Sequence, residues 1–144
     1  MIILDTNVIS ELFRAQPNPK VVSWVVSLSG EVAITAITVA ELLAGVHRLP
    51  GGRRKDLLAK DIETALKPYR NSQSLLLFDS EAARYYADVV VHREKAGQPI
   101  STADAQIAAI CLAHNATCAT RNVKDFAHTG VQLFNPWDPP GSSD

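Results

Sequence analysis

The amino-acid sequence predicts an α/β fold in which one parallel sheet is covered by helices on both faces. Short apolar runs alternate with longer segments in which apolar residues repeat at helical spacing. The short runs are apolar on both faces, as strands are when helices cover both sides of a parallel sheet. The chain has 144 residues, of which 47% are hydrophobic and 20% are charged, and this suits one domain with a packed core.

The N-terminal half contains two expected strands and four expected helices. Pro17 and Pro19 separate the first two helices, and Pro50-Gly51-Gly52 separates the last two. The last two helices are therefore predicted to form a helical hairpin. The strands are residues 2–4 and 32–35, and the helices are residues 8–13, 21–28, 39–49 and 57–66.

The C-terminal half repeats the alternation of strands and helices. Asp79 or Ser80 can cap a long helix that ends at about Ala96, before Gly97 and Pro99. The domain is expected to cover residues 1–137, and the polar, proline-containing tail 138–144 is expected to be disordered. The other expected elements are strands 75–78, 116–119 and 131–134, a helix over 103–111 and a helical turn over 123–126.

Composition excludes some classes of function. Lys plus Arg is 14 and Asp plus Glu is 15, for a net charge of −1, which argues against a protein that coats nucleic acid or membranes by bulk charge. No apolar run approaches the length of a membrane-spanning helix, and the first residues lack the basic segment of a signal peptide. We therefore expect a cytoplasmic protein, with Cys111 and Cys118 as buried free thiols.

Four acidic residues occur where the predicted strands end or helices begin. Asp5 follows the first strand, Glu41 lies early in the helix after the second, and Asp125 follows the fourth. Asp104 opens a helix that can start at the same edge if the preceding helix runs back to it. Ligands of open parallel sheets collect at the carboxyl ends of the strands, so these four acids are candidates for one site.

Each of these acids can also be explained without any chemistry, as a helix cap. A cap contributes about 1 kcal/mol and requires only the right spacing from a Ser, Thr or Asn. The candidate caps are Asp5 or Asn7 for the first helix and the pairs Thr38-x-x-Glu41, Ser101-x-x-Asp104 and Asn122-x-x-Asp125.

If the acids do converge, their carboxylates repel one another, and a hard divalent cation relieves that repulsion. Oxygen ligands of this kind suit Mg²⁺ or Mn²⁺. A divalent cation can activate water and hold a phosphate oxygen. The joint pattern therefore favours phosphodiester hydrolysis.

Four segments of the chain, in this order, resemble the PIN-domain ribonucleases, and in particular the VapC-type toxins of type II toxin–antitoxin pairs, including their FitB-like branch. The resemblance runs from Met1 to about Trp137. Each segment alone is a weak signal, whereas four at family-like separations are a strong one. The segments are residues 3–12 (ILDTNVISEL), 37–45 (ITVAELLAG), 100–109 (ISTADAQIAA) and 119–126 (ATRNVKDF).

The resemblance implies a three-layer α/β/α sandwich around a parallel sheet of about five strands. It also implies RNA cleavage that depends on Mg²⁺, with Mn²⁺ possible, by a homodimer that a small VapB-like DNA-binding antitoxin neutralises. Asp5 and Asp104 match direct metal ligands, and Glu41 matches an acid that assists or holds a water on the ion.

The fourth acidic position of the family falls on either Asn122 or Asp125 in this chain. Asp125 is favoured because Asn122 brings no charge. Thr6, Asn7 and Thr120 are expected to support the site. Near it, the cations Arg14, Arg121 and Lys124 are candidates for phosphate contacts, and a basic cluster, Arg53-Arg54-Lys55, lies at the expected hairpin tip.

Three alternative functions fit the sequence less well. A receiver-like signalling module would need an acidic pair near the first strand and a Lys after the last, and the chain has only Asp5 and no such Lys. A haloacid-type phosphatase would need an Asp where Asn7 stands. A PIN fold kept as a binding module without catalysis would not need three matching acids.

Overall fold

The computed structural model describes residues 1–139. Its strands are β1 (Ile2–Leu4), β2 (Val32–Thr35), β3 (Leu75–Leu76), β4 (Thr117–Ala119) and β5 (Gln132–Phe134). Its helices are α1 (Thr6–Leu12), α2 (Pro19–Ser27), α3 (Ala36–His47), α4 (Arg53–Leu66), α5 (Ser80–Lys95), α6 (Thr102–Ala113) and the 3₁₀ turn η1 (Val123–Phe126). Every expected element is therefore present in the expected order.

The five strands form one parallel sheet in the order β3-β2-β1-β4-β5. In the central register, Ile3 pairs with Ala33 on one side and with Cys118 on the other. Strands β2 and β3 lie on one side of β1, and β4 and β5 lie on the other. The chain therefore crosses over the sheet between β3 and β4. This reversal of strand order beside β1 is where parallel sheets of this type place a ligand site.

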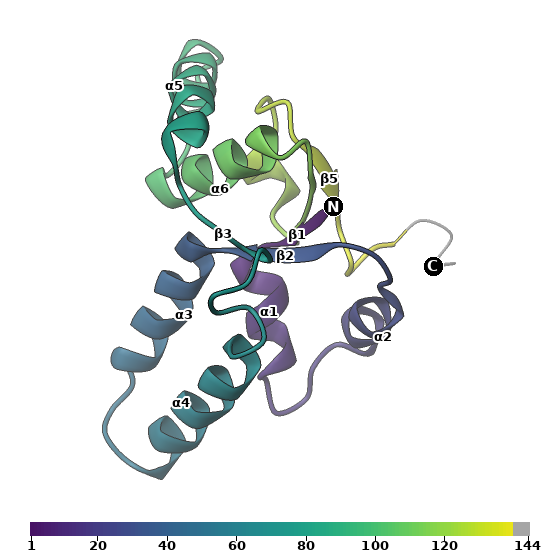
Figure 1. The fold of residues 1–144 in the computed structure, drawn as a ribbon, viewed down its shortest axis with the longest axis vertical. Coiled ribbons are helices and arrows are strands. Elements are labelled where there is room, and N and C mark those ends of the chain that lie inside the picture. Colours follow the sequence, from purple (N-terminus) through teal and green to yellow (C-terminus); the bar gives the residue numbers. More distant parts are fainter. Residues whose placement is uncertain (140–144) are drawn as a thin grey trace.

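Two apolar cores cover the two faces of the sheet, so the predicted three-layer α/β/α sandwich is confirmed (Figure 1). Helices α5 and α6 lie over one face, and α1 to α4 lie over the other. Alternate strand residues supply the two cores, because successive side chains of a strand point to opposite faces. Thus Ile3 belongs to the core under α6, while Leu4 belongs to the core under α1.

The bounds of some elements differ from those predicted. Helix α3 begins at Ala36, three residues before the expected start, because Thr35 caps it and its hydroxyl accepts a hydrogen bond from the Thr38 N–H at 3.1 Å. Strand β3 stops at Leu76, since it is an edge strand paired only with β2 and the next residue, Leu77, is 61% exposed. An apolar pattern indicates burial, whereas caps and strand pairing depend on hydrogen bonds, so the ends of elements predicted from it differ by a few residues.

The hairpin and the thiols are as expected. Helices α3 and α4 lie side by side, and α4 starts after Gly52, whose φ of 148° favours glycine. Cys111 and Cys118 are both buried and free. Within residues 1–139 no helix combines the length and the apolar character needed to cross a membrane. Most of the predicted tail, residues 140–144, lies outside the described residues.

Candidate active site

A pocket of about 400 Å³ opens at the carboxyl edge of the sheet, and we call it the acid pocket. Asp5 reaches it from the end of β1, Glu41 from the second turn of α3, and Asp104 from the first turn of α6. Three segments far apart in the sequence thus bring three predicted acids to one place. The other lining residues are Thr6, Asn7, Ser10, Glu11, Arg14, Arg121, Asn122 and Trp137.

Asp5 is the most buried of the three acids, with 4% of its surface exposed. Its Oδ1 accepts the Thr6 N–H at 2.8 Å, as expected of a cap on α1. Its Oδ2 accepts the Thr120 hydroxyl at 2.8 Å and the Asn7 amide at 3.1 Å. A helix cap needs only the contact between Oδ1 and the Thr6 N–H. The role of a cap therefore does not explain why Oδ2 is also held by Thr120 and Asn7.

Burial raises the pKa of the Asp5 carboxyl from 3.8 to about 6. The hydrogen bonds from Thr120 and from the Thr6 N–H oppose the rise, and the charges of Asp104 and Glu41 add to it. The three acids are therefore near enough to act on one another electrostatically.

Glu41 is an exposed side chain whose Oε1 accepts the Thr6 hydroxyl at 2.6 Å. Thr6 Oγ1 also lies 3.0 Å from Thr38 Oγ1, which ties the start of α1 to α3. The capping-box explanation of Glu41 is wrong, because Thr35, and not Thr38, is the N-cap of α3. Glu41 lies too far along α3 to complete a box with Thr35.

Asp104 is half-buried in the first turn of α6, behind the N-cap Ser101. Ser101 Oγ accepts the Asp104 N–H at 3.2 Å, so the predicted cap of α6 forms. Burial raises the pKa of the Asp104 carboxyl, and the charges of Asp125 and Glu41 raise it further. Ser101 and Arg93 act in the opposite direction. Asp104 therefore lies at the capped start of α6 and is also close enough to other acids for their charges to raise its pKa.

Asn122 and Asp125 are the two candidates for the fourth acidic position of the site. Asn122 lines the acid pocket, whereas Asp125 is exposed on η1 outside that lining, although its charge acts on Asp104. Asn122 makes no side-chain cap to η1, so the expected Asn122-x-x-Asp125 cap is wrong. The choice of Asp125 as the fourth acid stays a prediction.

Asn7 and Thr120 join the two loops that flank Asp5. The Asn7 amide donates to Thr120 Oγ1 at 3.2 Å, and Asn7 Oδ1 accepts the Arg121 N–H, also at 3.2 Å. Thr120 Oγ1 additionally accepts the Asn122 N–H at 3.0 Å. These contacts hold the β1 and β4 ends together around the Asp5 carboxylate.

Sequence reasoning missed three residues of this pocket: Ser10, Glu11 and Trp137. Glu11 is 4% exposed and accepts the Asn18 N–H at 2.8 Å and the Arg14 guanidinium at 3.1 Å. The Asn18 contact, with help from Arg14 and Arg121, lowers the pKa of Glu11. The available signal for Trp137 was its position just after the last strand, at the same sheet edge as the acids.

The comparison with known families settles the class of protein. The family model described as "PIN domain" matches residues 2–131. The chain belongs to the PIN-domain family.

Relatives and solved structures place this PIN domain among VapC- and FitB-type toxins, which confirms the predicted resemblance. Toxin FitB of Neisseria gonorrhoeae is 44% identical over 138 residues, 95% of this chain and 99% of FitB. VapC ribonuclease Y4jK of Sinorhizobium fredii is 39% identical over 140 residues, 96% of this chain and 99% of the relative. The structure of FitAB bound to the IR36 DNA fragment matches with a TM-score of 0.90 at 40% identity, covering 99% of this chain and 100% of that chain.

The acid pocket of this PIN domain fits a small divalent cation by its donor set. Asp5, Glu41, Asp104 and Asn122 offer oxygen ligands on its lining. The charge of Glu41 helps to raise the pKa of both Asp5 and Asp104, so the three acids lie close together. Among residues 1–139 no three Asp, Glu, His or Cys side chains stand close enough to enclose an ion. Mg²⁺ does not need such a cage, because it binds through one or two carboxylates and keeps several waters.

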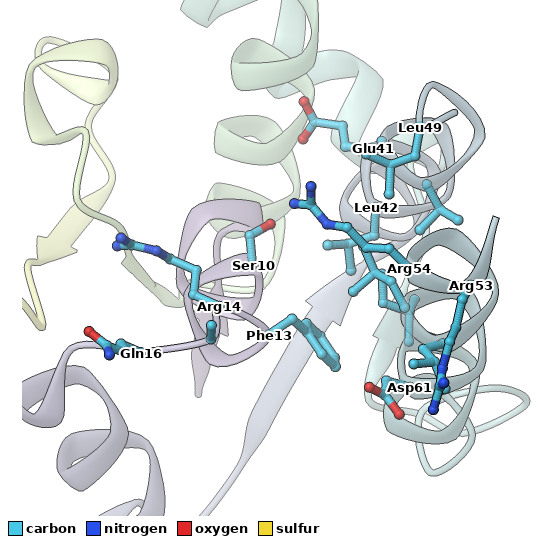
Figure 2. Close-up of a pocket in the computed structure, with 16 residues that line it drawn as sticks. Ser10, Phe13, Arg14, Gln16, Glu41, Leu42, Leu49, Arg53, Arg54 and Asp61 are labelled. Atoms are coloured by element: carbon cyan, nitrogen blue, oxygen red, sulfur yellow. The ribbon is translucent and has the colours of Figure 1, made fainter. Parts of the chain in front are cut away.

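A larger groove of about 1090 Å³ adjoins the acid pocket and shares Ser10, Arg14 and Glu41 with it. We call it the hairpin groove, because α3 and α4 form its walls together with the end of α1 (Figure 2). Figure 2 shows the Arg54 side chain extending into this groove. Its apolar lining comprises Phe13, Leu42, Val46, Leu49, Leu57, Leu58 and Ile62.

Proposed function

We propose that this PIN domain is a metal-dependent endoribonuclease that acts as the toxin of a toxin–antitoxin pair. The observation that carries the proposal is the convergence of Asp5, Glu41 and Asp104 in one pocket, where burial and mutual repulsion raise the pKa of both aspartates. The names of its relatives, a VapC ribonuclease and the toxin FitB, support the same class of activity.

In the proposed mechanism each acid has a separate task. Asp5 and Asp104 would hold the cation, with Mg²⁺ expected and Mn²⁺ as the alternative. Thr6 holds the Glu41 carboxylate, which orients the attacking water and accepts its proton. When bound, a divalent cation lowers the pKa of water and neutralises charge on the phosphoryl oxygens. Asn7 and Thr120 keep Asp5 in place.

The test is cleavage of total RNA by partner-free protein in Mg²⁺, in Mn²⁺ or in EDTA. We expect discrete fragments that require the cation and that disappear in Asp5→Asn and Asp104→Asn. Glu94→Gln, which changes an exposed acid on α5 away from the pocket, is the matched control and should cleave like the wild type. Absence of cleavage on several RNAs by folded, metal-loaded protein would overturn the nuclease and leave a PIN-fold binding module.

We further propose that the antitoxin covers the hairpin groove. An amphipathic segment suits this groove, because its lining is largely apolar and also includes Arg14, Arg53 and Arg54. The test is binding of the cognate antitoxin to Leu57→Glu, where Leu57 is 51% exposed and lines the groove. Val26→Glu, an exposed aliphatic on α2 outside the groove, is the control. Equal affinity for both variants would move the antitoxin elsewhere.

Two further expectations stay predictions. The homodimer is checked by light scattering on the purified chain, and the cytoplasmic location by fractionation of cells that express it.

A further inference from the structure

Arg121 and Trp137 form a contact on the rim of the acid pocket that the proposed mechanism does not use. The Arg121 guanidinium lies over the Trp137 ring, 5.3 Å from its centroid, and both residues line the pocket. Arg121 is exposed and Trp137 is half-buried. An aromatic ring and a cation thus lie beside the three acids at the mouth of the pocket.

Trp137 is held as a fixed platform. Trp137 follows Pro136, which is fully buried, and the backbone N–H of Trp137 donates to Asn135 Oδ1 at 2.9 Å. One side of Trp137 packs against the core under α1. The chain's other tryptophan, Trp24, has a purely structural setting, because it stacks on Phe134 with 4.9 Å between ring centroids.

A second arginine lies on the same rim. Arg14 also lines the pocket and is paired with Glu11 at 3.1 Å. Arg121 is close enough to Glu11 that its charge helps to lower the pKa of that carboxyl. The pocket therefore carries acids suited to a cation and guanidinium groups suited to phosphate oxygens.

A flat ring next to guanidinium groups matches single-stranded RNA, whose unpaired bases stack on aromatic side chains while basic side chains hold the backbone. Stacking on a base is stronger than an exposed contact between Arg and an aromatic ring. A phosphate would therefore draw Arg121 off Trp137, and a base would take its place on the exposed side of the ring.

We propose that Trp137 stacks on an unpaired base of the RNA substrate, next to the phosphate that is cut, and that Arg121 binds a neighbouring phosphate. This rests on the proposed nuclease function, and it assigns the base at the cleavage position to Trp137 and a neighbouring phosphate to Arg121. Both are positioning residues for RNA and take no part in bond breaking.

The test measures binding in EDTA, where no cleavage is expected, by anisotropy of a labelled single-stranded RNA 12-mer and of the matched duplex. We expect Trp137→Ala to weaken binding to the single strand about tenfold and Trp137→Phe to retain most of the affinity. Arg121→Ala should lower the slope of log affinity against log salt by about 0.7, whereas Trp137→Ala should leave that slope unchanged.

Trp137 also provides a direct optical signal. Since the chain has two tryptophans, Trp24→Phe leaves Trp137 as the only one. Stacking on a base should quench its fluorescence when the RNA is added, and the Trp24→Phe, Arg121→Ala double variant should show weaker quenching at equal RNA concentration. This measurement stands even if Trp137→Ala does not fold.

The outcomes separate this proposal from the one on which it rests. If the wild type cleaves RNA, but the Trp137 and Arg121 variants bind and cleave as it does, the stacking proposal is overturned and the nuclease remains. If folded wild type neither cleaves nor binds any RNA, both are overturned. Retained kcat with a raised KM in Trp137→Ala is the expected kinetic result, because the acids are untouched.

Discussion

The Thr6 hydroxyl donates a 2.6 Å hydrogen bond to Oε1 of Glu41, although the two residues lie 35 positions apart in the chain. Thr6 is the first residue of α1, directly after Asp5, and Glu41 is exposed on α3. The contact therefore ties an otherwise free carboxylate to the segment that carries the most buried acid of the pocket.

Replacing the Thr6 hydroxyl should release the Glu41 carboxylate, and it also removes the contact with Thr38 that joins α1 to α3. Thr6→Val removes the hydroxyl at nearly constant volume, and we expect kcat/KM for RNA cleavage to fall about tenfold, the effect of losing roughly one hydrogen bond. Thr6→Ser keeps the hydroxyl and should cleave like the wild type. Mn²⁺ titration by calorimetry gives a second readout, in which Thr6→Val should bind the ion more weakly than Thr6→Ser, which keeps the hydroxyl and both of its contacts. Equal ion affinity and equal kcat/KM in both variants would argue against this positioning role.

Asp5 should make the metal-free protein less stable as the pH rises. Between pH 3.8 and about 6 the folded protein keeps a proton on Asp5 that the unfolded chain has released, so the free energy of unfolding falls through this window. The raised pKa corresponds to about 3 kcal/mol above pH 6. Asp5→Asn carries no charge, so its stability relative to the wild type should improve by that amount between about pH 3 and pH 8.

Urea unfolding of both proteins in EDTA across that pH range measures the effect. Parallel stability curves would show that burial does not raise the pKa of Asp5. Added Mg²⁺ should stabilise the wild type and leave Asp5→Asn almost unchanged, because only the wild type has the carboxylate ligand.

Arg93 should be important for stability and for the placement of η1. Its side chain is 5% exposed and donates to the carbonyls of Gln98 at 2.5 Å, Asp125 at 2.6 Å and Ala127 at 2.9 Å. Arg93→Ala removes three hydrogen bonds and the packing of a buried side chain, and it should lower the free energy of unfolding by about 3 kcal/mol. Arg84→Ala, an exposed arginine of the same helix, should change it by less than about 0.5 kcal/mol. Equal denaturation midpoints for the two variants would contradict this.

Glu11 should contribute stability that acid removes. Its pKa is lowered from 4.5, chiefly by the Asn18 N–H, so its contribution is complete above pH 4.5 and is lost as the pH falls through the lowered value. Glu11→Gln should therefore melt below the wild type at pH 7, and the gap in Tm should close as the pH falls below 4.5 and through the lowered pKa. Thermal unfolding followed by circular dichroism checks this, and a gap that persists at low pH would point to packing and not to charge.

The order and type of the elements follow from local patterns in the sequence. Runs such as residues 32–35 must be buried on both faces, and this property alone requires helices on both sides of the sheet. Helix starts were predicted less well, because a cap such as Thr35 acts through a hydrogen bond that leaves no trace in apolar periodicity. The same gap explains why the capping box at Glu41 was predicted wrongly.

The residues of the acid pocket also fall into two groups, those that the sequence predicted and those that it did not. Asp5, Glu41 and Asp104 were recognisable because each follows a strand or opens a helix at one sheet edge, and the family resemblance covers the segments around them. Trp137 and Glu11 were not, because an aromatic residue near the chain end and an acid within a helix have ordinary structural roles in most proteins. Their place in the pocket depends on chain segments that meet only after folding.

By itself, then, the sequence determined the α/β class, the succession of strands and helices and the three acids, since each depends on burial or on position relative to one strand. Only the tertiary structure decided the strand order β3-β2-β1-β4-β5 and the hydrogen bond from Thr6 to Glu41. It also decided that Asn122 lines the pocket and that the Arg121 guanidinium lies over the Trp137 ring. These are contacts between residues far apart in the chain. Their energies depend on distance and burial, which no local pattern of residues specifies.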